Sequence, residues 1–127
     1  MAADLKFAKT HEWIRPESGG LATVGISAYA VEALTDLVFM QLPQVGRKVK
    51  AGESIGEIES VKAVSDFYAP VSGEIVEVNA AVPNALETLG QDPYGAGWLV
   101  KIRPDDPAEM SALLDQAAYD ALVKAGH

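Results

Sequence analysis

The spacing of apolar residues along the chain predicts a mainly β fold. Trp13 and Ile14 suit a strand, and the glycine-rich turn that follows them is typical of a hairpin. Between 45 and 82, short β-type runs alternate with glycine, as expected for strands joined by tight turns. Prolines end two of the runs, because a proline cannot donate to a strand ladder. The clearest predicted strands are 21–26, 38–42, 71–78 and 98–102.

Helical spacing replaces the β pattern in two segments. Ser27 is a predicted N-cap for a short amphipathic helix near 28–35. A C-terminal helical segment at about 106–125 begins with Asp106 as its cap, and Glu109 can close a capping box. The spacing is compatible with one helix or with two short ones. Residues 83–97 are predicted to be mostly loop. The apolar face of the C-terminal segment is predicted to consist of Met110, Leu113, Leu114, Ala117, Ala118, Ala121 and Leu122.

One hairpin is of particular interest because of the residue at its tip. The runs 53–58 and 64–69 both read as strands, and Glu59-Ser60-Val61-Lys62-Ala63 lies between them. The residues beside Lys62 are small or short, so we expect nothing to crowd its amine. The pattern therefore predicts that Lys62 points into water from a turn.

Composition and charge narrow the class of protein. At 127 residues, we expect one domain spanning 1–127. The net charge of −8 argues against nucleic-acid and anionic-membrane partners, because the chain would be repelled by both. We expect the protein to be a monomer and to be located in the cytoplasm. No apolar run approaches the roughly 20 residues of a membrane span. The first residues lack a secretory or transit pattern, although a mature imported form, for example in the mitochondrial matrix, would look the same.

The chain lacks the residues that most kinds of catalytic or metal site require. There is no cysteine, and His11 and His127 are far apart, so no metal site is expected. No phosphate-binding loop precedes a helix, and no serine stands in a nucleophile elbow. Glu57 and Glu59 share one strand face, and we expect them to form a solvated strand edge. Lys62 is the remaining candidate for site chemistry. An exposed amine with a pKa of ~10.4 is a poor base at neutral pH but a good acceptor for acylation.

Several short motifs, in this order and spacing over nearly the whole chain, resemble those of the H protein of the glycine cleavage system, a family of lipoate carriers. They are Thr10-His11-Glu12-Trp13, Val24-Gly25-Ile26, Tyr29-Ala30, Leu42-Pro43-Gln44-Val45-Gly46, Glu59-Ser60-Val61-Lys62-Ala63, Pro70-Val71-Ser72-Gly73-Glu74, Val78-Asn79, Asp92-Pro93-Tyr94 and Gly97-Trp98.

The resemblance implies a lipoyl/biotinyl-type flattened barrel (a barrel-sandwich hybrid) with added helices. It also implies a carrier that is not an enzyme and that bears lipoate on Lys62 in amide linkage. In this family the arm takes an aminomethyl group from glycine decarboxylase to a tetrahydrofolate-dependent aminomethyltransferase, and dihydrolipoyl dehydrogenase reoxidises it. Lipoate-attaching enzymes load the lysine. By motif, Thr10, Glu12 and Asp66 form the cleft for the loaded arm.

Three alternatives stay open at this point. An H-like carrier could serve lipoate relay or sulfur metabolism and would differ in its partners. A biotin carrier domain typically has methionine on both sides of its lysine, where this chain has Val61 and Ala63. A lysine-dependent enzyme would require a buried Lys62 with a depressed pKa.

Overall fold

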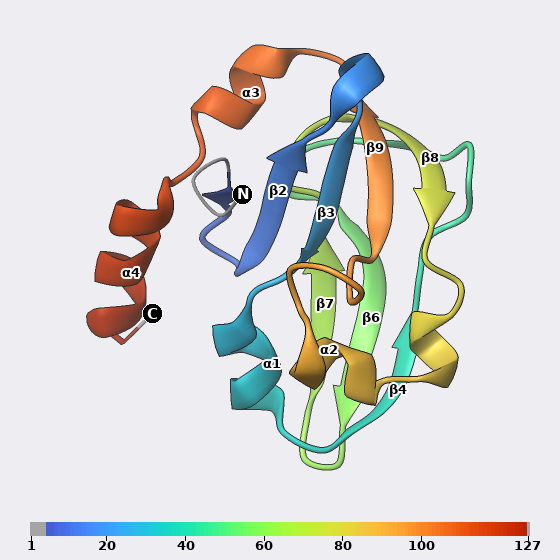
Figure 1. Ribbon diagram of the computed structural model, residues 1–127, viewed down its shortest axis with the longest axis vertical. Coiled ribbons are helices and arrows are strands. Elements are labelled where there is room, and N and C mark those ends of the chain that lie inside the picture. The colour runs from blue at the N-terminus through green and yellow to red at the C-terminus, as the bar shows by residue number, and fades with distance from the viewer. Residues whose placement is uncertain (1–4, 127) are drawn as a thin grey trace.

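The larger of two antiparallel sheets contains six strands and carries the N-terminal hairpin. The structure is a computed structural model that describes residues 5–126, so predictions for residues 1–4 and for His127 lie outside the described residues (Figure 1). The strand order is β1-β2-β3-β9-β8-β5. The strands are β1 (Lys6–Phe7), β2 (Glu12–Pro16), β3 (Ala22–Ile26), β5 (Lys48–Val49), β8 (Gly73–Val78) and β9 (Val100–Pro104).

The smaller sheet has three strands and contains the Lys62 hairpin. It is formed by β4 (Leu37–Gln41), β6 (Ser54–Ser60) and β7 (Val64–Tyr68), in the order β4-β6-β7. All pairings in both sheets are antiparallel. The predicted mainly β fold is therefore confirmed, although several strand ends differ from the prediction. Strand β8 starts two residues later than expected, and β9 is displaced to Val100–Pro104 from the predicted 98–102.

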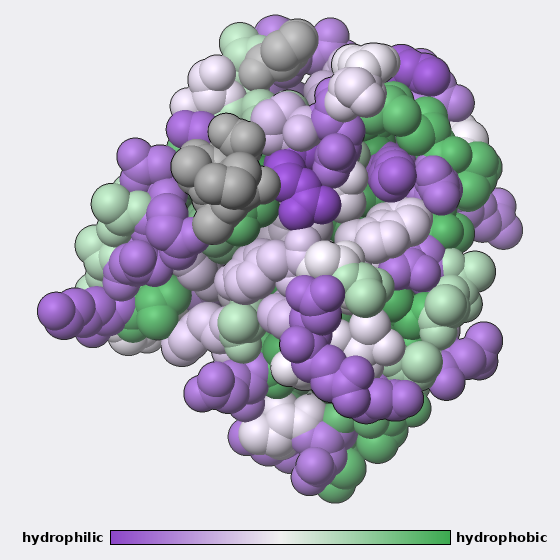
Figure 2. Space-filling view, viewed as in Figure 1, coloured by the Kyte–Doolittle hydropathy of each residue, from purple (hydrophilic) through white to green (hydrophobic). Residues whose placement is uncertain are grey.

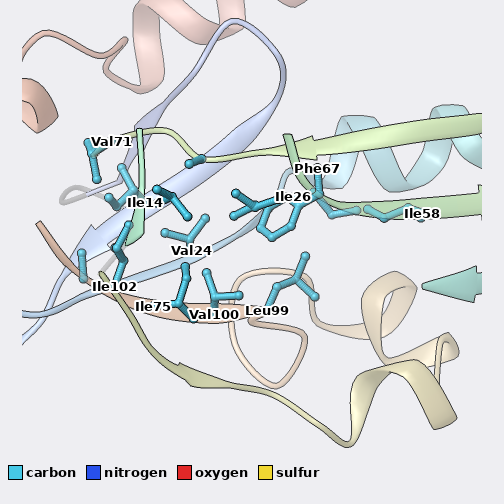
Figure 3. Packing of buried hydrophobic residues seen from close by; sticks show 14 of the residues in the cluster. Ile14, Val24, Ile26, Ile58, Phe67, Val71, Ile75, Leu99, Val100 and Ile102 are labelled. Atoms are coloured by element: carbon cyan, nitrogen blue, oxygen red, sulfur yellow. The ribbon is translucent and has the colours of Figure 1, made fainter. Parts of the chain in front are cut away.

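The two sheets pack face to face around one apolar core. Figure 3 shows Val24 and Ile26 of the larger sheet directed toward the same interior as Ile58 and Phe67 of the smaller one. These side chains are at most 4% exposed. Each fully buried side chain of this size contributes about 1.5–3 kcal/mol through removal of apolar surface from water. The core therefore fixes the smaller sheet, and with it the hairpin, to the rest of the barrel.

Two short helices cover one end of the barrel. Helix α1 (Ala28–Leu34) begins as predicted, because the Ser27 hydroxyl accepts a hydrogen bond from the backbone N–H of Ala30. Helix α2 (Glu87–Gln91), preceded by a 3₁₀ turn at Val82–Asn84, lies beside α1 (Figure 1). The sequence predicted a mostly irregular segment over 83–97. That prediction was wrong where the 3₁₀ turn and α2 form, because both elements are too short to show a helical period in the sequence.

The C-terminal segment forms two short helices, one of the two arrangements that the spacing allowed. Helix α3 (Pro107–Ser111) is followed by α4 (Gln116–Lys124), which begins at a second cap, Asp115. The interruption resets the helical phase, so the predicted apolar face was wrong for Ala117, Ala118 and Ala121, which are exposed. Instead α4 packs against Phe7 and Trp13 through the buried Tyr119 and the half-buried Leu122 and Val123, and Leu114, just before the helix, joins the same cluster.

The start of α3 differs from the predicted capping box. Asp106 caps the helix as expected, since its carboxylate accepts a hydrogen bond from the backbone N–H of Ala108 at 3.0 Å. Glu109 does not close a box. Its carboxylate accepts hydrogen bonds from the backbone N–H and the hydroxyl of Ser72, at 2.7 and 3.3 Å. Glu109 thus ties α3 to the segment before β8, which is a tertiary contact that the local sequence does not indicate.

Candidate functional site

Lys62 lies in the exposed turn that joins β6 to β7, as predicted. The pairing of β6 with β7 ends at Glu59 and Val64. Hydrogen bonds between Ser60 and Ala63 close the turn. The N–H and the hydroxyl of Ser60 donate to the carbonyl of Ala63 at 2.8 and 3.3 Å, and the N–H of Ala63 donates to the Ser60 hydroxyl at 3.1 Å. Because β6 continues to Ser60, the turn is shorter than the sequence indicated. These bonds fix the backbone of the turn, and the Lys62 side chain is exposed.

The turn is also held from the side. The backbone N–H of Val61 donates to the carbonyl of Asp36, just before β4, at 3.0 Å. Ser60 is buried, whereas Val61, Lys62 and Ala63 are exposed. The lysine therefore stands on a fixed support while its side chain remains in water. An exposed amine does not have the burial that a lysine-dependent enzyme requires.

Apolar side chains surround the turn. Val61 is 73% exposed and Val64 is 63% exposed, and Val38 and Phe39 of β4 are also exposed. Phe39 pairs with Glu59, which in turn pairs with Val64, so one row of the outer sheet face combines apolar and acidic residues. Large exposed apolar residues gathered in one place are typical of contact surfaces. Figure 2 shows hydrophobic and hydrophilic residues side by side at the lower end of the molecule.

Glu57 and Glu59 do not lie at a sheet edge. They share one face, as predicted, but β6 is the central strand of the smaller sheet, and both residues are half-buried. The expectation of a solvated strand edge was therefore wrong. Sequence alone did not reveal that β4 would pair with β6 on the side opposite β7.

Glu12 is a buried carboxyl at the start of β2, and only 1% of it is exposed. One oxygen accepts a hydrogen bond from the Thr10 hydroxyl, and the other accepts one from the backbone N–H of Tyr68 at 3.0 Å. Burial raises the pKa of the Glu12 carboxyl to about 7, against the opposing effect of these hydrogen bonds. The group is therefore close to half-ionised at neutral pH, and a cation nearby would favour its charged form.

Asp66 is exposed on β7 and is connected to Glu12 only through Tyr68. Its carboxylate accepts hydrogen bonds from the Ser54 hydroxyl at 3.1 Å and from the Tyr68 hydroxyl at 3.2 Å. The negative charge of Asp66 raises the pKa of the Tyr68 phenol. The structure thus brings Thr10 and Glu12 into contact, and it links Asp66 to Glu12 through Tyr68. Tyr68 was missed in the sequence, because its bond to Glu12 uses the backbone.

His11, between Thr10 and Glu12, is half-buried and has a positive φ of 81°. Its Nδ1 is 2.7 Å from the Tyr119 hydroxyl, which is also 2.6 Å from the Ser27 hydroxyl. Tyr119 stacks on Phe7 with ring centroids 4.2 Å apart. Helix α4 therefore fixes the position of the chain segment that contains Thr10 and Glu12. Within residues 5–126, no group of three or more acidic or histidine side chains is placed to hold a metal ion.

A flattened barrel of two antiparallel sheets that presents one exposed lysine at the apex of a hairpin is the architecture of small carrier domains. None of the helices over 5–126 is long and apolar enough to span a membrane. The family described as "Glycine cleavage H-protein" matches residues 5–126. The chain belongs to this family.

Similar proteins agree along almost their whole length. A glycine cleavage system H protein of Symbiobacterium thermophilum is 52% identical over 124 residues, covering 98% of this chain and 96% of the relative. One of Escherichia coli is 52% identical over 122 residues, covering 96% and 95%. A crystal structure of a glycine cleavage system H protein from Mycobacterium marinum has a TM-score of 0.87 at 47% identity, and the match covers 96% of this chain and 98% of that one.

Proposed function

We propose that Lys62 bears the lipoyl group with which this chain acts as the carrier of glycine cleavage. The observation that carries the proposal is the position of Lys62, exposed in a closed turn whose backbone is anchored to Asp36. An enzyme active site can take in such an amine without unfolding the carrier. Neither side of Lys62 carries the methionine that biotin domains typically have.

The residues around Lys62 fit a long covalent arm. Val61 and Ala63 are exposed and small enough to leave the amine accessible from several directions. The chain has no cysteine, so lipoate, when attached, supplies the dithiol that the polypeptide lacks. The chain's own contribution is to display the attachment point and to shelter the far end of the arm.

Thr10, Glu12 and Asp66 are proposed to hold the cationic end of the loaded arm. Glu12 supports this role because its buried carboxyl has a raised pKa, and a cation that approaches would stabilise the carboxylate that burial disfavours. Thr10 and the N–H of Tyr68 already orient the carboxyl. Lys62 lies in the turn before β7 and Tyr68 is the last residue of β7, so the two are up to roughly 20 Å apart along the chain. The arm would therefore lie along the hairpin.

The proposed partners follow from the family. The chain would be a co-substrate of glycine decarboxylase, the aminomethyltransferase and dihydrolipoyl dehydrogenase, and would itself catalyse no reaction. A small carrier of net charge −8 suits basic docking surfaces on these enzymes. The same proposal includes a cytoplasmic location for the protein, as the sequence predicted.

Glycine-dependent release of CO₂ by a glycine decarboxylase tests this function. The loaded wild-type chain should support the reaction, and Lys62→Arg, which cannot be acylated, should not. Lys50→Arg is the matched control, because Lys50 is another exposed lysine in a tight turn. Failure of the loaded wild type with a decarboxylase that accepts other H proteins would contradict the proposal and favour a different lipoyl pathway.

A further inference from the structure

A groove between α1 and α2 lies outside the Thr10–Glu12 cleft. It consists of two adjoining hollows of about 470 Å³ and about 160 Å³, which share Val31 and Gly90 as lining residues. Val31, Leu37 and Leu86 give the larger hollow its apolar walls. The groove is therefore concave, open and partly apolar, as contact pockets at interfaces are.

The groove is acidic along its length. Asp36 and Glu87 line the larger hollow, and Glu32 lines the smaller one. Among the described residues, no Lys, Arg or His lines either hollow, and these three carboxylates make no ion pair or side-chain hydrogen bond. Their charges are thus available to a partner that presents Lys or Arg side chains.

One end of the groove adjoins the lysine turn. The carbonyl of Asp36, a lining residue, accepts the hydrogen bond from the N–H of Val61 at 3.0 Å. Leu37, also a lining residue, pairs with Ser60. In Figure 1 the turn between β6 and β7 lies at the same end of the molecule as α1 and α2. A protein that binds the Lys62 turn from this side would also contact the groove.

We propose that this groove is the docking site for the enzyme that attaches lipoate to Lys62. The inference rests on the proposed function, because it assumes that Lys62 is the residue loaded. The enzyme must draw the Lys62 amine into its active site, so its footprint has to surround the turn. A specific interface buries about 800 Å² per partner, far more than a turn offers, so the footprint extends onto neighbouring surface.

The groove suits this extension better than the outer face of the smaller sheet. Beyond the row that contains Phe39, that face presents Gln41, Glu57 and Asp66 side by side, which is a polar row without apolar walls. The groove combines apolar walls with an acidic rim. It fits a segment of the enzyme in which basic side chains flank an apolar one.

Lipoylation kinetics with a purified ATP-dependent lipoate–protein ligase test the docking site. Gly90→Phe places a large side chain in the groove, where a Cβ would meet nothing within 4 Å, and Gly90→Ala is its matched control. Glu87→Lys reverses one rim charge. Asp105→Lys makes the same change in net charge at an exposed position on the chain segment before α3, away from the groove.

The KM for the carrier should rise roughly 10-fold with Gly90→Phe and with Glu87→Lys, at unchanged kcat, because docking weakens while the amine is untouched. Both controls should stay within about twofold of the wild type. Added salt should raise the wild-type KM more than that of Glu87→Lys. Thermal unfolding checks that each variant is folded.

Two outcomes would overturn the docking site. One is wild-type kinetics for folded Gly90→Phe and Glu87→Lys. The other is a KM defect in Glu57→Lys, on the sheet face, with none in the groove variants. Either outcome leaves the function of Lys62 standing as long as intact mass shows that the wild type is loaded. Failure to load the wild type at all refutes the proposed function instead.

Discussion

Replacing the buried Glu12 by glutamine should make the protein more stable at alkaline pH and change the pH dependence of its stability. The folded state raises the pKa of Glu12 from 4.5 to about 7, mainly because burial disfavours the charge. A shift of about 2.5 units corresponds to about 3 kcal/mol of differential stability. Glutamine resembles the protonated acid: its oxygen can accept from the N–H of Tyr68, and its amide can donate to the Thr10 hydroxyl.

The sign follows from proton binding. Between pH 4.5 and 7 the folded protein holds a proton on Glu12 that the unfolded chain has released. The contribution of Glu12 to the free energy of unfolding is thus fully present below pH 4.5 and is lost as pH rises through 7. Glu12→Gln has no such loss. The stability of the variant minus that of the wild type should therefore grow by about 3 kcal/mol from pH 4.5 to pH 8.

Urea unfolding of both proteins at constant ionic strength, in steps from pH 4.5 to 8, measures this difference. Glu17 and Glu53, whose pKa values are lowered, contribute equally to both proteins and cancel. Asp66→Asn is the control, because it makes the same kind of acid-to-amide change at an exposed position. A Glu12→Gln difference that varies by less than about 0.5 kcal/mol over this range would refute the assignment of a buried, desolvated carboxyl.

Two further predictions concern the supports of the site. Tyr119→Phe should lower the free energy of unfolding by about 1–3 kcal/mol, because Ser27 and His11 lose a hydroxyl partner at 2.6 and 2.7 Å; a loss below about 0.5 kcal/mol in urea unfolding would contradict that network. Gly25→Ala should destabilise by about 1–3 kcal/mol, because its Cβ would lie 2.7 Å from the buried ring of Trp13. An unchanged thermal midpoint for Gly25→Ala would show that β3 does not require this close approach.

The hairpin was predictable because its signals are local. Alternating residues on both sides of 59–63 indicated two strands, and the small neighbours of Lys62 indicated an open tip. Register and face follow once the turn is placed, since successive side chains alternate across a strand. What the sequence did not reveal was the pairing of the predicted strand at 38–42, which forms β4, with β6; this pairing makes β6 central and places Phe39 beside Glu59.

The buried environment of Glu12 was not predictable from the sequence. The family motif implied that Glu12 is a cleft residue, but it did not indicate that the carboxyl is buried. Burial of Glu12 depends on the backbone of Tyr68, 56 positions away, so no local pattern could reveal it. The same holds for the groove, because its walls come from residues near 31–37 and near 86–90, and the latter formed an unpredicted helix.

Helices form in the C-terminal segment as predicted, but its apolar face was predicted wrongly in part, for a different reason. A single helical period was laid across 106–125, although Asp115 is itself a good cap and begins a new helix. Treating Asp115 as a second start would have placed Tyr119 on the buried face. This correction matters for the site, because Tyr119 holds His11 between Thr10 and Glu12.

Peptide-level mass spectrometry of the lipoate-loaded chain tests the central claim most directly. The chain would be co-expressed with a lipoate–protein ligase, digested and fragmented, so that the modified residue is located along the sequence. The account predicts one lipoyl increment, on the peptide that contains Lys62, and none in Lys62→Arg. A lipoyl group on any other lysine, a biotinyl increment at Lys62, or a loaded Lys62→Arg chain would contradict it.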